Sequence, residues 1–94
     1  MVWESVGGTM LEVCVRNLAV KGRLIVIGMM SQYASGWAAS SMKGLPERLL
    51  GKSATMSGFF YPHYFRKIKS HLPRLLQAWA EGRLHIAIDP ARFV

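Results

Sequence analysis

The sequence is poor in cysteine and shows no cluster of metal ligands. Cys14 is the single cysteine among 94 residues, so no disulfide framework can form within the chain. A reducing intracellular compartment is therefore the expected setting. His63, His71 and His85 have no mutual spacing suited to a metal ion and no second ligand set accompanies them, so we expect no zinc.

Long apolar runs and targeting signals are also lacking. The longest apolar run, residues 24–30, has seven residues and includes a glycine, which is far too short to span a bilayer. The first residues show no basic stretch before an apolar core, and the last show neither a lipidation motif nor a peroxisomal tripeptide. We expect no membrane partner and no signal peptide. The chain opens inside a predicted strand and stops just past another, so we expect a fragment of a longer domain.

Acidic residues are scarce, with five Asp and Glu against twelve Lys and Arg, which gives a net charge of +7. Such a balance invites a nucleic-acid-binding interpretation. The only basic cluster, Arg66, Lys67 and Lys69, lies on a predicted helix and is typical of a solvated helix face. No motif of a nucleic-acid-binding module accompanies the charge, so we expect no nucleic-acid partner. An apolar content of 51% indicates a packed globular chain.

What is present is an alternation of strand and helix patterns. Residues 2–5 predict the end of a strand, followed by the Gly7-Gly8 turn. Thr9 is expected to cap a helix that runs to Val20. Its buried face is expected to consist of Met10, Leu11, Cys14, Val15 and Leu18.

The second half of the alternation begins at Gly22, where we expect the left-handed end of that helix. Residues 23–27 are apolar without alternation and predict a strand buried on both faces. Residues 29–46 predict a long loop, and loops of that length are usually functional or mobile. A helical turn over 47–50 and a third strand over 53–60 are expected to follow.

Pro62 fits the first turn of a last helix, which Gly82 should end. Pro73 within it should kink it. The inward face is expected to carry Phe65, Ile68, Leu72, Leu75, Leu76 and Trp79. Residues 85–88 predict one more short strand. This order predicts an α/β fold with a parallel or mixed sheet, whose ligands would lie beyond the carboxyl ends of the strands.

Five segments carry a resemblance to a known family: residues 4–8, 21–28, 31–33, 52–55 and 58–60 followed by His63 and Tyr64. In this order and spacing the chain resembles the C-terminal part of the nucleotide-binding domain of the zinc-independent, quinone oxidoreductase-like medium-chain dehydrogenases/reductases. It is most similar to the subgroup called prostaglandin reductase type three. The resemblance implies a partial Rossmann-like sheet, doubly wound and mostly parallel, whose first half is missing from residues 1–94.

The resemblance also implies an activity, which is the NADPH-dependent reduction of the C=C bond of α,β-unsaturated ketones, 15-oxoprostaglandins among them. It implies NADP(H) as cofactor, a homodimer formed through strand 53–58, and a peroxisomal or mitochondrial parent protein. Tyr33 matches a tyrosine that contacts cofactor and substrate and can donate a hydrogen bond to the enolate oxygen. The positions that match cofactor-binding segments are Ser5, Ile27, Gly28, Met29, Met30, Ser31, Gln32, Tyr33, Phe59, Phe60 and Tyr61.

Two observations keep a second interpretation open. The 94 residues contain no glycine-rich phosphate fingerprint and no group placed to recognise the adenosine end of a dinucleotide. An intact active site therefore cannot be assembled from these residues, and we expect the isolated chain to be inactive. The alternative is a small basic α/β interaction module that binds an anionic partner without catalysis. Taken singly, Tyr33 is typical of a loop aromatic, and Phe59 and Phe60 of packing residues.

Overall fold

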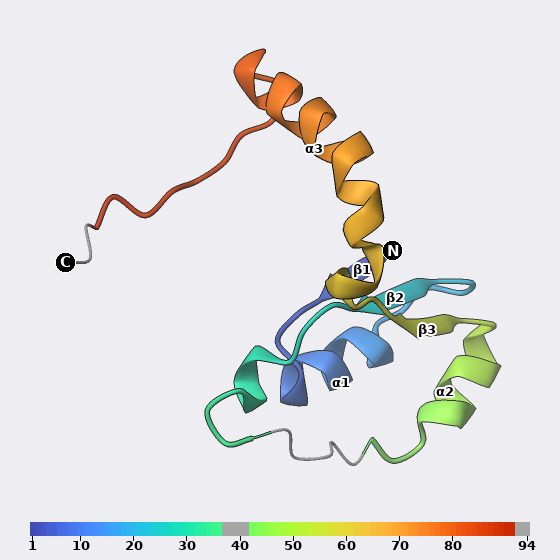
Figure 1. The fold of residues 1–94 in the computed structure, drawn as a ribbon. Coiled ribbons are helices and arrows are strands. Elements are labelled where there is room, and N and C mark those ends of the chain that lie inside the picture. Colours follow the sequence, from blue (N-terminus) through green and yellow to red (C-terminus); the bar gives the residue numbers. More distant parts are fainter. Residues whose placement is uncertain (37–41, 92–94) are drawn as a thin grey trace. The chain divides into compact units, whose positions relative to one another are not determined.

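The computed structural model describes residues 1–36 and 42–91 (Figure 1). Strands and helices alternate as expected, and the fold is α/β. The described chain divides into two compact units, Met1–Tyr61 and Pro62–Val94. The elements in chain order are β1 (Val2–Glu4), α1 (Gly8–Arg16), β2 (Arg23–Val26), the 3-10 helix η1 (Met30–Gln32), α2 (Leu45–Lys52), β3 (Thr55–Gly58), the 3-10 helix η2 (Tyr61–Tyr64) and α3 (Phe65–Ala80).

The first unit is built on a parallel sheet of three strands in the order β1-β2-β3. Trp3 lies opposite Ile25 in the register of β1 and β2, and Leu24 lies opposite Met56 in that of β2 and β3. Because all three strands run the same way, their carboxyl ends meet at one edge of the sheet. The sequence predicted a parallel or mixed sheet, and the three strands of the structure form a parallel one.

The core of this unit lies between the sheet and α1, which covers one face of the strands (Figure 1). The fully buried apolar side chains are Leu11, Val15, Leu18 and Leu24. Three of the five residues predicted for the buried face of α1 are therefore correct. Cys14 is half-buried, and Met10, in the first turn of α1, is 50% exposed.

The ends of α1 differ from the prediction. Gly7 rather than Thr9 precedes the helix, and no side chain caps it. The helix ends at Arg16 instead of Val20, where the Asn17 side chain donates a hydrogen bond to Val13 O at 2.8 Å. The left-handed residue of the following turn is Lys21, with φ of 59°, and not Gly22.

A lysine from α2 satisfies the end of α1. Lys52 Nζ donates hydrogen bonds to Arg16 O at 2.9 Å and to Leu18 O at 2.5 Å. The Lys21 N–H donates to Lys52 O at 2.7 Å. Because the last carbonyls of a helix have no partner within it, a cation at this position both bonds and neutralises them.

Helix α2 is longer than the predicted turn over 47–50, and β3 is shorter than the predicted strand over 53–60. Ser53 adopts the left-handed conformation and ends α2, so the strand begins only at Thr55. Part of the loop predicted over 29–46 is ordered as η1 and as the start of α2. Residues 37–41 of that loop lie outside the described residues. Strand β2 is also one residue shorter than predicted, and Ile27 is 44% exposed instead of buried.

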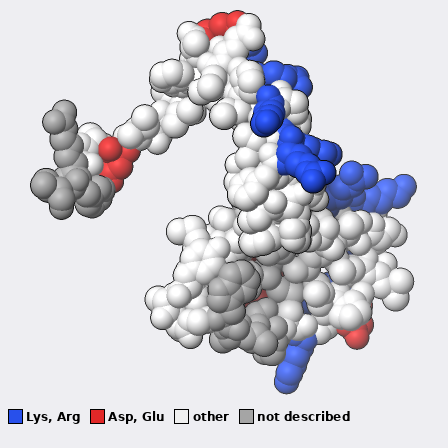
Figure 2. Space-filling model, in the orientation of Figure 1, with Lys and Arg blue, Asp and Glu red and all other residues white. Residues whose placement is uncertain are grey.

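The second unit consists of α3 and the segment after it. Gly82 follows the end of α3 with φ of 72°, as predicted, and Pro73 lies inside the helix. The basic side chains lie along one side of it (Figure 2). The predicted burial of its apolar face is wrong for this chain: Ile68 is half-buried, and the exposed fractions of Phe65, Leu72, Leu75, Leu76 and Trp79 lie between 47% and 56%.

The strand predicted over 85–88 is also absent from the described part of this unit, where these residues are irregular. A strand is stabilised by hydrogen bonds to a neighbouring strand, and residues 85–88 pair with no strand in the described part of the chain. Among the described residues, no helix combines the length and the apolar character that crossing a bilayer requires.

Candidate functional site

The turn after β1 is organised by a buried carboxylate. Glu4 is 2% exposed, and its side chain accepts hydrogen bonds from the Val6 N–H at 2.8 Å and the Gly7 N–H at 3.0 and 3.1 Å. A buried carboxylate without partners would be costly, so these bonds are what make its position tolerable. Gly7 has φ of 77°, a conformation that a side chain would disfavour. Glu4 therefore fixes the backbone that leaves the carboxyl end of β1.

The segment after β2 is bonded to that turn. The N–H groups of Ile27, Met30 and Ser31 donate to the carbonyl oxygens of the turn, at 2.8, 2.9 and 2.8 Å. Their acceptors are Glu4, Ser5 and Val6 respectively. Ser31 Oγ adds a bond of 2.6 Å to Val6 O. Residues 27–33 and residues 4–8 thus form one bonded edge.

Glycines allow these two segments to approach one another. A Cβ at Gly7 would lie 3.2 Å from Met29 Sδ, and one at Gly8 would lie 3.3 Å from Ser31 Oγ. At Gly28 a Cβ would lie 2.9 Å from the Tyr33 hydroxyl and 3.3 Å from Ser5 O. Gly28 is the tightest of the three positions, because a Cβ closer than 3.0 Å to another atom forces one of the two atoms to move.

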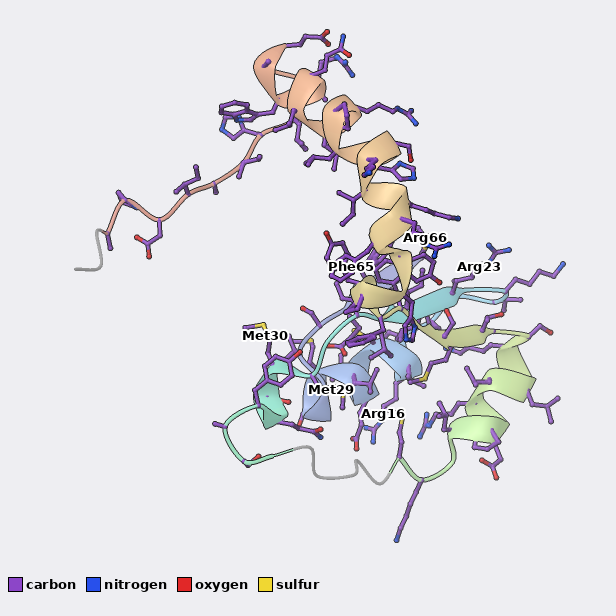
Figure 3. All side chains as sticks on the ribbon, in the orientation of Figure 1. Arg16, Arg23, Met29, Met30, Phe65 and Arg66 are labelled. Carbon is purple, nitrogen blue, oxygen red and sulfur yellow. The ribbon has the colours of Figure 1, made fainter. Side chains whose placement is uncertain are left out.

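Tyr33 folds back over this edge. Its hydroxyl oxygen accepts a hydrogen bond from the Met29 N–H at 3.1 Å, while the residue is 53% exposed. A phenol that accepts a bond can also donate its own O–H. Accepting from an N–H polarises the O–H and strengthens it as a donor. Met29 and Met30, labelled in Figure 3, lie in the same segment.

The third strand contributes the other part of the edge. The Phe59 N–H donates to Val26 O at 2.9 Å, which continues the β2–β3 ladder past the end of β3. The Phe59 ring packs edge-on against Trp3 of β1, with ring centroids 6.1 Å apart and an interplanar angle of 77°. Phe60 and Tyr61 follow, and are 58% and 53% exposed.

The structure thus brings Ser5 together with residues 27–33, and places residues 59–61 after the neighbouring strand. What sequence reasoning missed is the role of Glu4, which belonged to a recognised segment but received no function. An acidic residue inside an otherwise apolar strand, three residues before a glycine, was the available signal. The bond between Met29 and Tyr33 had no signal in the sequence.

The arrangement offers backbone polar groups and apolar side chains at one edge. Parallel strands that end together leave N–H and C=O groups directed beyond the sheet, where a planar amide-bearing ring can be received. Ile27 and Met30 add apolar surface, being 44% and 65% exposed. Among the described residues no group of three or more His, Cys, Asp or Glu is placed to hold a metal ion.

Comparisons with known proteins give relatives for almost the whole chain. No protein-family profile matches it. Prostaglandin reductase-3 of Mus musculus is 48% identical over 91 residues, which are 95% of this chain and 24% of that protein. A probable quinone oxidoreductase of Leishmania amazonensis is 34% identical over 97 residues, covering 99% of this chain and 28% of that protein.

A solved structure shows the same fold. CurA of Vibrio vulnificus, crystallised in complex with NADPH, matches 92% of this chain with a TM-score of 0.72 and 25% identity. This chain covers 27% of the CurA chain. It therefore spans about a quarter of the length of the proteins that it matches.

Proposed function

The chain corresponds in sequence and fold to the C-terminal part of the nucleotide-binding domain of the medium-chain dehydrogenases/reductases, and we propose that it supplies the nicotinamide side of an NADPH site in a reductase. Residues 1–94 would be one portion of that domain. The observation that carries the proposal is the bonded edge formed by residues 4–8 and 27–33 at the carboxyl ends of β1 and β2. Ligands of open α/β sheets lie at this edge.

The proposed cofactor contacts follow the three strand ends. Ser5 would lie beside the cofactor, and the segments after β2 and β3 would enclose the nicotinamide ring and meet its carboxamide. They comprise Ser5, Ile27, Gly28, Met29, Met30, Ser31, Gln32, Tyr33, Phe59, Phe60 and Tyr61. The choice of NADPH is supported by the cofactor named in the CurA structure.

The proposed reaction is the reduction of the C=C bond of an α,β-unsaturated ketone, with 15-oxoprostaglandins as one substrate class. The bound cofactor supplies a hydride to the β-carbon. The π electrons then shift toward the carbonyl oxygen, and a proton adds at the α-carbon to complete the saturated ketone. Tyr33 would donate its O–H to the oxygen where negative charge grows, and the Met29 N–H would hold that hydroxyl in place. The proposal requires no zinc.

The isolated chain should not perform this reaction. Residues 1–94 contain no glycine-rich turn of the G-x-G-x-x-G type to hold the pyrophosphate. Purified chain assayed with NADPH and an enone should show no NADPH consumption above the protein-free control. Consumption above that control would contradict the requirement for further residues.

A graft tests the proposal for a whole protein. The chain replaces the matched segment of the mouse prostaglandin reductase-3, to which it is 48% identical. We expect the graft to oxidise NADPH in the presence of an enone, as its unmodified host does. A folded graft that binds no NADPH would contradict the proposal. One that binds NADPH without turnover would contradict the assignment of the reaction.

A second candidate function is a basic interaction module without catalysis, favoured by the net charge of +7. The two candidates differ in the graft, since an interaction module would leave the host unable to turn over its substrate. Only the reductase proposal includes a homodimer, which would form through residues 53–58.

A further inference from the structure

A pocket on the helical side of the first unit lies apart from the sheet edge. It has a volume of about 210 Å³ and is lined by Glu12, Val15, Arg16, Met42, Lys43 and Arg48. These residues come from α1, from the segment before α2, and from α2 itself. None of them belongs to the segments proposed to bind a cofactor.

The charge of the lining is strongly unbalanced. Three of its side chains are basic and one is acidic. The acidic residue, Glu12, forms an ion pair with Arg16 at 3.7 Å, one turn along α1 (Figure 3 labels Arg16). Within the described part of the chain, the side chains of Lys43 and Arg48 form no ion pair and no hydrogen bond. Positive charge therefore exceeds negative charge by two inside one concave surface.

The walls of the pocket are held together by the fold. Val15 is buried in the core and so fixes the orientation of α1, the helix that carries Glu12 and Arg16. Lys52 joins the end of α1 to α2 through its bonds to Arg16 O and Leu18 O. The backbone of both helices is therefore held in place before a ligand binds, which lowers the entropy lost on binding. The exposed residues Arg16, Lys43 and Arg48 line this hollow.

We propose that this pocket binds the phosphate group of a small phosphorylated molecule. A phosphate monoester carries between about −1.5 and −2 charges at neutral pH, which balances the excess of the lining, whereas a single carboxylate would leave part of it uncompensated. The hollow is below the roughly 300–1,000 Å³ of sites that enclose whole drug-sized ligands, so it holds the anionic group while the rest of the molecule stays outside. Arginine binds phosphate through paired N–H donors, and lysine adds a point charge.

The test is a titration of the full chain with inorganic phosphate, followed by isothermal calorimetry at physiological ionic strength. Arg48→Gln should weaken binding about tenfold, the usual effect of losing one charge-assisted hydrogen bond. Glu12→Gln should tighten binding, because it removes the only carboxylate of the lining. Arg23→Gln, which removes an equal charge at the start of β2 in the same unit, is the matched control. It should change the affinity less than about twofold, because Arg23 does not line the pocket and exposed charges outside it are largely screened at this ionic strength.

Equal losses from Arg48→Gln and Arg23→Gln would overturn the proposal, because binding would then follow net charge alone. Weaker binding by Glu12→Gln would also overturn it. Parallel titrations with acetate and citrate distinguish phosphate from carboxylate ligands. Citrate that binds more tightly than phosphate would assign the pocket to carboxylates instead. The outcome is independent of the proposed cofactor site, since no residue is shared between the two.

Discussion

At position 28 a single methyl group decides where the Tyr33 hydroxyl can lie. A Cβ there would come within 2.9 Å of that oxygen, although the backbone of Gly28 lies outside the left-handed region. The glycine therefore leaves the space in which the Tyr33 hydroxyl lies, and its own backbone conformation does not call for glycine. The Met29 N–H then holds the hydroxyl at 3.1 Å. Tyr33 and Gly28 act as one unit at the proposed site.

Gly28→Ala and Tyr33→Phe should therefore have the same consequence in the graft. Loss of one donor to a developing oxyanion lowers kcat by about tenfold to about a thousandfold. The double variant should be no slower than Tyr33→Phe alone, because both changes remove the same hydroxyl from its position. Steady-state kinetics of the four proteins measure this coupling.

Gly51→Ala is the matched control for that cycle, since nothing lies within 4 Å of a Cβ at position 51. Its kcat should equal that of the unmodified graft. Losses from Gly28→Ala and Tyr33→Phe that simply multiply in the double variant would show that the two residues act independently, against this account.

Glu4 is the second residue on which the edge depends. Glu4→Ala leaves the Val6 and Gly7 N–H groups without their acceptor and should lower the free energy of unfolding by about 2–6 kcal/mol, from about 1–3 kcal/mol for each of the two unsatisfied groups. Glu4→Gln keeps one acceptor oxygen and should cost less. Urea unfolding followed by tryptophan fluorescence gives both values.

The exposed carboxylate Glu81, which pairs with Arg83 at the surface, provides the comparison, and Glu81→Gln should change stability by no more than about 1 kcal/mol. If Glu4→Ala proved as mild as Glu81→Gln, the carboxylate would not be what holds the turn.

At the scale of the element, α1 and α2 depend on one lysine. Lys52→Met keeps the aliphatic stem and removes the ammonium group that bonds Arg16 O and Leu18 O. We expect a loss of about 1.5–3 kcal/mol, the range for a hydrogen bond to a charged group, since one of the two carbonyls can turn to water. Chemical denaturation reports it, with Lys69→Met on α3 as the control that should be nearly neutral.

Strand β3 is the edge of the three-stranded sheet and carries the proposed dimer contact. The N–H groups of Thr55 and Phe59 donate to β2, at Gly22 O and Val26 O, both at 2.9 Å. Because the strand period is two, the N–H groups of Met56 and Gly58 are directed away from β2.

Gly58→Pro should therefore remove an outward donor and shift the graft from dimer to monomer in sedimentation. Thr55→Pro removes an inward bond and should instead destabilise the sheet. A dimer that survives Gly58→Pro with unchanged affinity would place the contact elsewhere.

The chain order of the three strands and their approximate positions were predictable from the alternation of strand and helix patterns. The signal is plainest for β2, an apolar run between Gly22 and Gly28. The end of α1 was not, because it is fixed by Lys52, which lies 36 residues away from Arg16. Residues 85–88 have the composition of a strand but no neighbouring strand, and composition alone does not supply one. The assignment of Ser5 and residues 27–33 to the site followed from the family resemblance. The hydrogen bonds of Glu4 and Met29 depend on backbone geometry that no sequence motif encodes.

At the scale of the whole molecule, both proposed sites lie in the first unit. The carboxyl edge of the sheet presents backbone groups, glycines and Tyr33. The helical side presents a basic pocket between α1 and α2. The second unit contains α3, whose large apolar side chains are about half exposed. Within the described residues, no other element buries this apolar face.

The central claim is that the carboxyl edge receives the nicotinamide end of NADPH. The most direct measurement is a titration of the isotopically labelled chain with reduced nicotinamide riboside, which carries no phosphate, followed through the backbone amide resonances. We predict saturable shifts at Ser5 and at residues 27–33 and 59–61, with no response around Arg48. Shifts confined to other residues, or an edge that stays unchanged while the ligand binds, would contradict the account.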